Sequence, residues 1–479
     1  MQMRHSLTGH IHFPAALPSL LGNRHVRIAL KVAGGLAATA AICVAAAAIY
    51  NAFDEDLGAQ AKALLTHEPM GRIDDSNGYI AFLGLTAPVG EDSLAWGRRA
   101  AAALSQQAQP GFTRTEAWRQ ATRPHLKFVT TSWCKPDCVS EARRDPGVVA
   151  ARLANATNAQ LLARYRLVRA APVFASLDLG SLHSGASSSY PALNAGASLA
   201  LADATLKADA GDIAAWVTEL ESETQFHRRM VSNGLTLATV MTGERLLARD
   251  LFAISAMLKT DSKRMAPYLA RLQDLTGPDL NATGIQAATR RLAHENVSWA
   301  QDWRRLFIEG GMPVTSWGAS LFIQPNTTAN VVAAVMSAEA SLAKVDAAQF
   351  DHASLATSSA NAARLERPWY REASNPVGKT LVELATSGSA KHVARFHDVR
   401  ALARMVDLQV TLARLGIVDL AAITAFVTSG AAAMPRDPYT EAPFAFDAEK
   451  RSISFEPRGN ARWSAELKKT SGGRVAVAL

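Results

Sequence analysis

Residues 32–50 read VAGGLAATAAICVAAAAIY, an unbroken apolar stretch without a charged side chain. Its length matches the roughly 20 residues that a helix needs to cross a bilayer. Acidic residues follow it directly at 54–56, and the basic residues that precede it are Arg4, Arg24, Arg27 and Lys31. Because a Lys and Arg excess stays on the cytoplasmic side, this pattern predicts one transmembrane helix over residues 32–53, with a cytoplasmic tail over 1–31.

A cleavable signal peptide is the alternative interpretation of the same stretch. Small residues such as Ala46 and Ala48 are typical of a signal-peptidase site. The apolar run is longer than a signal-peptide core, and the tail before it is long, which favours an uncleaved anchor. Either interpretation exports the rest of the chain, so a bacterial inner-membrane protein with a periplasmic body is expected.

The composition limits the partners that the exported part can have. The chain has 479 residues, 48% of them hydrophobic, which is enough for one large or two to three ordinary domains. The net charge is +8, but four of the 50 Lys and Arg residues precede residue 32, and the exported part is nearly balanced. No basic block with interleaved aromatic residues occurs, so nucleic acid is excluded as a partner. The expected partners are the bilayer, through residues 32–53, and an envelope protein or a second copy of the chain.

Helical periodicity dominates residues 54–390, the predicted periplasmic body. Residues 54–66 are expected to continue as a polar helix, and Asn326 is the expected N-cap of a helix over 327–342. The other ranges with apolar residues at three- and four-residue spacing are 148–171, 195–207, 210–231, 235–258, 262–275 and 284–306. Helices of this length joined by short turns predict an α-helical array.

The C-terminal part, residues 391–479, is predicted to combine helices with a small β-hairpin. Helices are expected over 392–415 and 419–427. Alternation of period two then places Phe444 and Phe446 before a four-residue turn and Ile453 and Phe455 after it, which is typical of a hairpin. The predicted fold class is therefore mainly α, with one transmembrane helix, an α-helical array and a small C-terminal β-hairpin.

Cys134 and Cys138 lie in the segment TSWCKPDCV, on the exported side. In an oxidising compartment such a pair is expected to form a disulfide that closes a small loop. A thiol-redox pair and a copper site remain alternatives. The first departs from the two-residue spacing of thioredoxin-like motifs, and the second needs a further ligand such as His125.

The other motifs favour structural roles. ASNPVGKT at 373–380 is close to a phosphate-binding loop, but Asn375 and Pro376 are typical of an N-cap and a first-turn proline. The acidic residues Glu219, Glu221 and Glu223 are interpreted as a solvated helix face. No catalytic residue, cofactor site or metal site is predicted, because no known catalytic or metal-binding motif is complete.

Several segments together resemble an uncharacterised family of membrane-anchored helical proteins of proteobacteria. They are GYIAFLGLTAPVGEDSLAWGRR, LLARYRLVRAAP, NGLTLATVMTGERLLARDL, FIQPNTTANVVA, NPVGKTLVELA and ARFHDVRALARMVDLQVTLARLG. The C-terminal DPYTEAPFAFD followed by SISFEP is similar to a pseudopilin-tail-like module that usually reads DPFTGKPLRY. Where HGxYP usually precedes this module, the present chain has LGIVD. The resemblance implies an anchored helical protein and assigns no activity.

The leading hypothesis is a single-pass inner-membrane protein whose periplasmic helical domain acts as a binding or scaffold component. The first alternative is a periplasmic enzyme whose site is assembled from distant residues such as Glu223, His227 or His294. The second is a thiol-redox or copper-handling protein that uses Cys134 and Cys138. Convergence of two of the first three side chains in a pocket is the observation expected to favour the enzyme.

Overall fold

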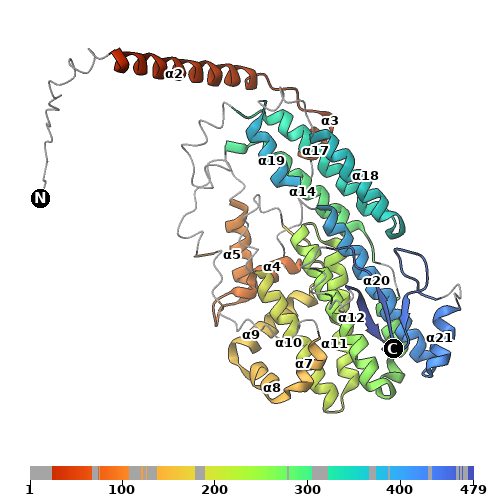
Figure 1. Ribbon diagram of the computed structural model, residues 1–479. Coiled ribbons are helices and arrows are strands. Elements are labelled where there is room, and N and C mark those ends of the chain that lie inside the picture. Colours follow the sequence, from red (N-terminus) through yellow and green to blue (C-terminus); the bar gives the residue numbers. More distant parts are fainter. Residues whose placement is uncertain are drawn as a thin grey trace, which may run out of the picture.

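The chain is mainly α-helical with one small sheet, as the sequence predicts (Figure 1). The computed structural model describes residues 24–66, 74, 76–106, 120–121, 126, 137–177, 189–277, 280–304, 322–365, 374–386, 389–429, 434–459, 463, 467 and 473–479. Within them, single turns of 3-10 helix occur at Gly84–Thr86, Ala266–Tyr268 and Leu342–Lys344.

The apolar stretch forms one long helix, α2 (Arg24–Asn51), which projects from the body (Figure 1). The segment Arg27–Ala46 is long and apolar enough to cross a membrane, and none of it is buried in the protein. The predicted polar helix over 54–66 is only partly correct. The chain is extended over 53–58, and α3 (Ala59–Leu65) begins after it. Residues 52–58 are called the linker below.

The first group of helices shares a core rich in aromatic rings. The Phe174 ring meets the rings of Phe82 and Phe226 edge to face, with centroids 5.9 and 5.5 Å away, a geometry that adds to the area burial of these rings. The helices of this group are α4 (Gly78–Leu83), α5 (Ser93–Gln106), α9 (Ala156–Ala170) and α10 (Ser189–Asp209).

The prediction of a single helix over 148–171 is wrong. Two helices, α8 (Pro146–Ala154) and α9, meet at Asn155, whose backbone is extended. The Asn155 side chain accepts hydrogen bonds from the Thr157 and Asn158 amides and so caps α9. Apolar periodicity continues across one capping residue, so it does not reveal such a break.

Two antiparallel helices, α11 (Ile213–Asn233) and α12 (Leu237–Met265), form the centre of the molecule. Asp261 has non-helical angles inside α12, at the break predicted between 258 and 262. Gly284 allows a close crossing, because a Cβ there would lie 1.9 Å from the Val231 carbonyl oxygen. The helices around this pair are α7 (Cys138–Arg144), α13 (Leu269–Thr276), α14 (Thr283–Gln301) and α20 (Ser389–Arg414).

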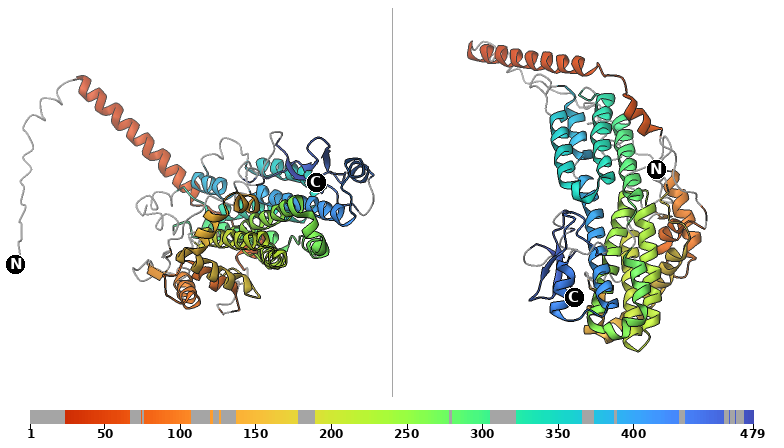
Figure 2. Two further views of the ribbon diagram at one scale, coloured as in Figure 1. Left: turned by 90° about the horizontal axis from the view of Figure 1, so that it is seen from below. Right: turned by 90° about the vertical axis from the view of Figure 1, so that its right-hand side faces the viewer.

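A third group of helices occupies the end of the body from which α2 leaves (Figure 2). It consists of α3, the second half of α14, α17 (Pro325–Ser341), α18 (Ala347–Leu365) and α19 (Pro376–Thr386). The predicted cap at Asn326 is wrong. Pro325 begins α17, and the Asn326 and Thr327 amides donate to the Asp54 carboxylate. Proline at the first position moves the helix start, and a residue of the linker takes the capping role.

The C-terminal part contains the predicted hairpin and one further strand. Phe446 pairs with Ile453 across the turn, and Ile453 pairs with Val477 on the other side. The hairpin is therefore part of a three-stranded antiparallel sheet that packs on α20 and α12. The helix expected over 419–427 is present, and the Asp419 side chain caps it by accepting from the Ala422 amide. The elements are α21 (Leu420–Thr428), β1 (Ala445–Asp447), β2 (Ser452–Phe455) and β3 (Val475–Ala478).

Candidate functional site

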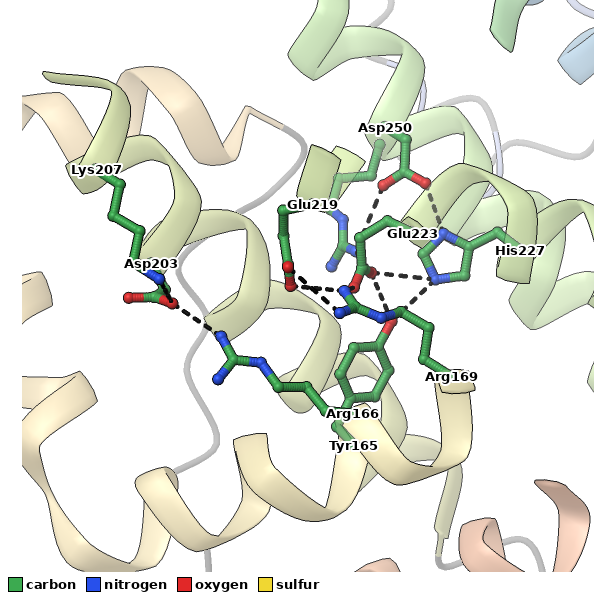
Figure 3. Close-up of polar contacts among 10 residues, drawn as sticks. Tyr165, Arg166, Arg169, Asp203, Lys207, Glu219, Glu223, His227 and Asp250 are labelled. Atoms are coloured by element: carbon green, nitrogen blue, oxygen red, sulfur yellow. Dashed lines mark hydrogen bonds and ion pairs between the residues drawn. The ribbon is translucent and has the colours of Figure 1, made fainter. Parts of the chain in front are cut away.

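A buried group of ionisable side chains lies where α9, α11 and α12 meet (Figure 3). Glu223 and His227 project from one face of α11 at a spacing of four residues, while α9 contributes Tyr165 and Arg169 at the same spacing. The remaining members are Glu219 from α11 and Arg249 and Asp250 from α12. These seven residues are called the Glu223 network.

His227 is the centre of the network. Its Nδ1 lies 2.6 Å from Asp250 Oδ2, and its Nε2 lies 3.6 Å from Glu223 Oε2. The Tyr165 hydroxyl lies 3.3 Å from the same Nε2 and donates to Glu223 Oε2 at 2.5 Å. Both ring nitrogens therefore face polar atoms, although Glu223, His227 and Asp250 are each 0% exposed.

Two guanidinium groups balance the carboxylates of the network. Arg169 donates to Glu223 Oε1 at 2.5 Å and to Glu219 Oε1 at 2.6 Å. Arg249 NH2 lies 3.8 Å from Glu223 Oε2 and 3.7 Å from Asp250 Oδ1. Three carboxylates thus face two guanidiniums and one imidazole. Buried charges persist in proteins when they are paired in this way.

Burial is the largest influence on the acidity of these groups. It raises the pKa of Glu223, while the charges of His227 and Arg169 act in the opposite direction. Burial and the nearby Glu223 raise the pKa of Tyr165 well above its usual value. A phenol that stays protonated is a stable hydrogen-bond donor to the Glu223 carboxylate.

The Glu223 network has the composition of a proton-transfer or metal site but not its accessibility. Glu223, His227 and Asp250 offer ligand atoms within 4.8 Å of one another. The same atoms already contact Tyr165 and the two guanidiniums, and none of the three side chains reaches the surface. In this arrangement the network holds three helices together.

A second buried group, called the Asp398 cluster, joins α12 and α20 to the C-terminal sheet. Both oxygens of Asp398 accept hydrogen bonds, from the Tyr439 hydroxyl at 2.6 Å, the Arg458 and Gly459 amides at 2.9 Å and Trp463 Nε1 at 3.0 Å. All four donors lie C-terminal to α21. The other members of the cluster are Glu244, Arg395 and His397, which are also buried.

Part of the Asp398 cluster lacks hydrogen bonds. Both oxygens of Glu244 and both ring nitrogens of His397 have no hydrogen-bond partner among the described residues. Burial is the main cause that raises the pKa of Glu244 to about 8, and Arg395, with Nε at 3.3 Å, opposes this only in part. Burial likewise lowers the pKa of His397 to about 4. Both groups are therefore neutral at pH 7.

Of the three side chains that the sequence suggested for an enzyme site, Glu223, His227 and His294, the structure brings two together. Glu223 and His227 are in contact range, whereas His294 lies elsewhere, with Nδ1 2.6 Å from the Leu64 carbonyl oxygen. The interpretation of Glu219, Glu221 and Glu223 as a solvated face is wrong for Glu223, which is fully buried. Glu221 pairs instead with Arg271 near the surface.

Only one cysteine of the predicted disulfide lies among the described residues. Cys138 is buried at the start of α7, and Cys134 lies outside the described residues, so the disulfide stays a prediction. The helix start expected at NPVGKT is confirmed, since α19 begins at Pro376. Asn375 has a different role from the expected cap, because its Oδ1 accepts from the Gln324 amide.

Local sequence patterns did not identify Tyr165, Asp250 and Asp398 as members of buried polar groups. For the two aspartates, the sequence does contain a signal of burial. Asp250 stands in LLARDLFAI and Asp398 in ARFHDVRAL, where a charge interrupts an apolar helix face. A carboxylate at such a position needs a buried partner. Tyr165 gives no comparable signal, because a tyrosine suits any core position.

No protein-family model, curated protein or solved structure matches this chain. The assignment of a role therefore depends on the geometry alone.

Proposed function

We propose that the protein is a single-pass membrane protein of the bacterial envelope, anchored by residues 32–53, whose periplasmic helical body acts as a binding or scaffold component. The observation that carries this proposal is α2, an apolar helix whose candidate span has no buried part. An exposed apolar surface of this size marks a contact with other apolar groups, and the length of the α2 span matches the thickness of a bilayer.

The way the linker meets the body supports the same proposal. Asp54 accepts from the Asn326 and Thr327 amides, and Asn330 contacts the Glu55 side chain and the Asp56 carbonyl oxygen. Gln324 donates to the Phe53 carbonyl oxygen at 2.8 Å. A body held this closely to its anchor stays at the membrane surface, which suits a component that binds or positions envelope partners.

Thiol labelling in intact cells tests the topology. In a Cys43→Ala background, Cys134 and Cys138 of the full-length protein are treated with a membrane-impermeant maleimide, with and without prior reduction. We expect a mass shift only after reduction, on a protein that sediments with membranes and keeps its N-terminus. Immediate labelling by a permeant reagent alone would place the body in the cytoplasm and contradict the proposal.

An enzyme built on the Glu223 network is the second candidate, because Glu223, His227 and Asp250 do converge. Chemistry there requires solvent access to His227. Diethyl pyrocarbonate modification of the folded protein, read by mass spectrometry, measures this access, with exposed His352 as the internal control. Protection of His227 until the protein unfolds favours the scaffold, and modification at the rate of His352 favours the enzyme.

A further inference from the structure

A small pocket lies between α17, α18 and α19. These helices occupy the end of the body from which α2 leaves (Figure 2). The volume of the pocket is about 70 Å³, several times the roughly 10–15 Å³ that one water molecule needs on the same measure. The lining residues are Thr327, Thr328, Val331, Arg364, Asn375, Lys379, Val382 and Glu383. The pocket therefore has room for one compact polar group.

The lining of this pocket carries two basic side chains and one acidic side chain. Arg364 comes from the last turn of α18 and Lys379 from the first turns of α19, while Glu383 is the single acidic residue of the lining. Arg364 is oriented by Asn361, whose Oδ1 accepts from it at 2.7 Å. Guanidinium and ammonium groups are the side chains that bind phosphate oxygens most strongly. The pocket thus fits a phosphate group better than a cation or a neutral ligand.

The walls of the pocket are fixed by the contacts that attach the anchor. Thr327 donates to Asp54 Oδ1 at 2.9 Å, and the Asn375 amide donates to Asn51 Oδ1 at 2.5 Å. Asn51 is the last residue of α2, so the pocket lies beside the point where the anchor ends. When α2 spans a bilayer, this position is at the depth of the headgroups.

The shape of the pocket depends on an unusual backbone at NPVGKT. Asn375 has a φ of 51°, and a Cβ at Gly378 would lie 2.1 Å from Thr328 Oγ1. The close approach of α19 to α17 therefore requires glycine at 378 and places Lys379 at the rim. The motif that resembles a nucleotide-binding loop thus forms one wall of the pocket.

We propose that this pocket binds the phosphate of an anionic phospholipid headgroup. The inference rests on the proposed membrane anchoring. Arg364 and Lys379 supply the positive charge, and Val331 and Val382 contact the carbon atoms next to the phosphate. Such a lipid adds a contact with the membrane to the hydrogen bonds by which the linker holds the body.

Lipid retention by the full-length protein tests this proposal. The protein is reconstituted in vesicles of equal parts phosphatidylglycerol and phosphatidylcholine, extracted in mild detergent and weighed by native mass spectrometry. We expect at least tenfold preferential retention of one phosphatidylglycerol. The double variant Arg364→Gln/Lys379→Gln should lose this preference, and Arg364→Lys/Lys379→Arg should keep most of it.

A matched control removes two positive charges elsewhere. Arg144→Gln/Lys259→Gln alters exposed residues of α7 and α12 and should retain the lipid like the wild type. Equal retention of both lipids by the wild type, or loss of preference in the control, overturns the proposal. So does retention of inorganic phosphate, added to lipid-free protein, with no preference between lipids. Failure of the wild type to enter vesicles would instead contradict the proposed anchoring.

Discussion

The Glu223 network and the Asp398 cluster are both buried, yet they differ in how their charges are compensated. Glu223 receives hydrogen bonds from Arg169 and Tyr165, and both ring nitrogens of His227 face polar atoms. In the Asp398 cluster, Asp398 accepts four hydrogen bonds, while Glu244 and His397 have none among the described residues.

This difference shows that burial has two outcomes for an ionisable side chain. Where several guanidiniums and hydrogen-bond donors surround a carboxylate, as at Glu223, they oppose the rise in pKa that burial causes and link the helices that carry them. Where one guanidinium is the main opposing charge, as at Glu244, burial dominates and raises the pKa to about 8, and the stability of the molecule gains a dependence on pH. Four changes test this contrast, and they are ordered here from the largest expected effect to the smallest.

Glu223→Ala should have the largest effect. It leaves Arg169 and His227 buried without their shared partner, and breaking a buried network in this way costs roughly 3–5 kcal/mol of unfolding free energy. Urea unfolding of the full-length protein in detergent measures the loss. Glu221→Ala is the matched control, because its pair with Arg271 lies near the surface, and should cost less than about 1 kcal/mol. Equal losses in the two variants would show that the network is not structural.

Asp398→Ala should release the C-terminal sheet. It leaves the Tyr439 hydroxyl, Trp463 Nε1 and two amides without their acceptor, and we expect a loss of roughly 2–4 kcal/mol. Hydrogen exchange should rise in β2 and β3 and stay unchanged in α17. Asp447→Asn, at an exposed position in the same sheet, is the control. Unchanged exchange in the sheet of Asp398→Ala would contradict the role given to this residue.

Glu244→Gln should remove part of the pH dependence of stability. The folded-state pKa of Glu244 is about 8, above the value of 4.5 for the unfolded chain, so the folded state binds more protons between these values. Its contribution is present at low pH and is lost as pH rises toward 8.

The measurement is the difference in unfolding free energy between Glu244→Gln and wild type at pH 6.5 and pH 8. It should change by about 2 kcal/mol in favour of the variant. Asp398, with a pKa of about 6, titrates mainly below this pH range, and its charge is one of the influences that raise the pKa of Glu244. A difference that stays constant with pH would mean that Glu244 is ionised throughout.

Asp54→Asn extends the comparison to a carboxylate near the surface. Asp54 caps α17, and weakening such a cap costs about 1 kcal/mol. We expect faster hydrogen exchange in the first turn of α17. Asp56→Asn is the control, because only the backbone of Asp56 contacts Asn330. A similar change in both variants would assign the effect to net charge and not to the cap.

The sequence by itself determined the helical class, the long apolar helix and most helix positions. These features depend on neighbours three or four residues away, so periodicity reveals α11, α12 and α20, and period-two alternation reveals the hairpin of β1 and β2.

Only the tertiary structure decided which polar side chains are buried and what they contact. Tyr165 and Glu223 lie 58 residues apart, and Asp54 and Thr327 lie 273 residues apart. The third strand and the cap of α17 likewise depend on distant partners. A helix that carries Glu219, Glu221 and Glu223 has the same local pattern whether these side chains meet water or a guanidinium from another helix. Packing makes that choice, because an ionised group leaves water only where another element supplies its counter-charge.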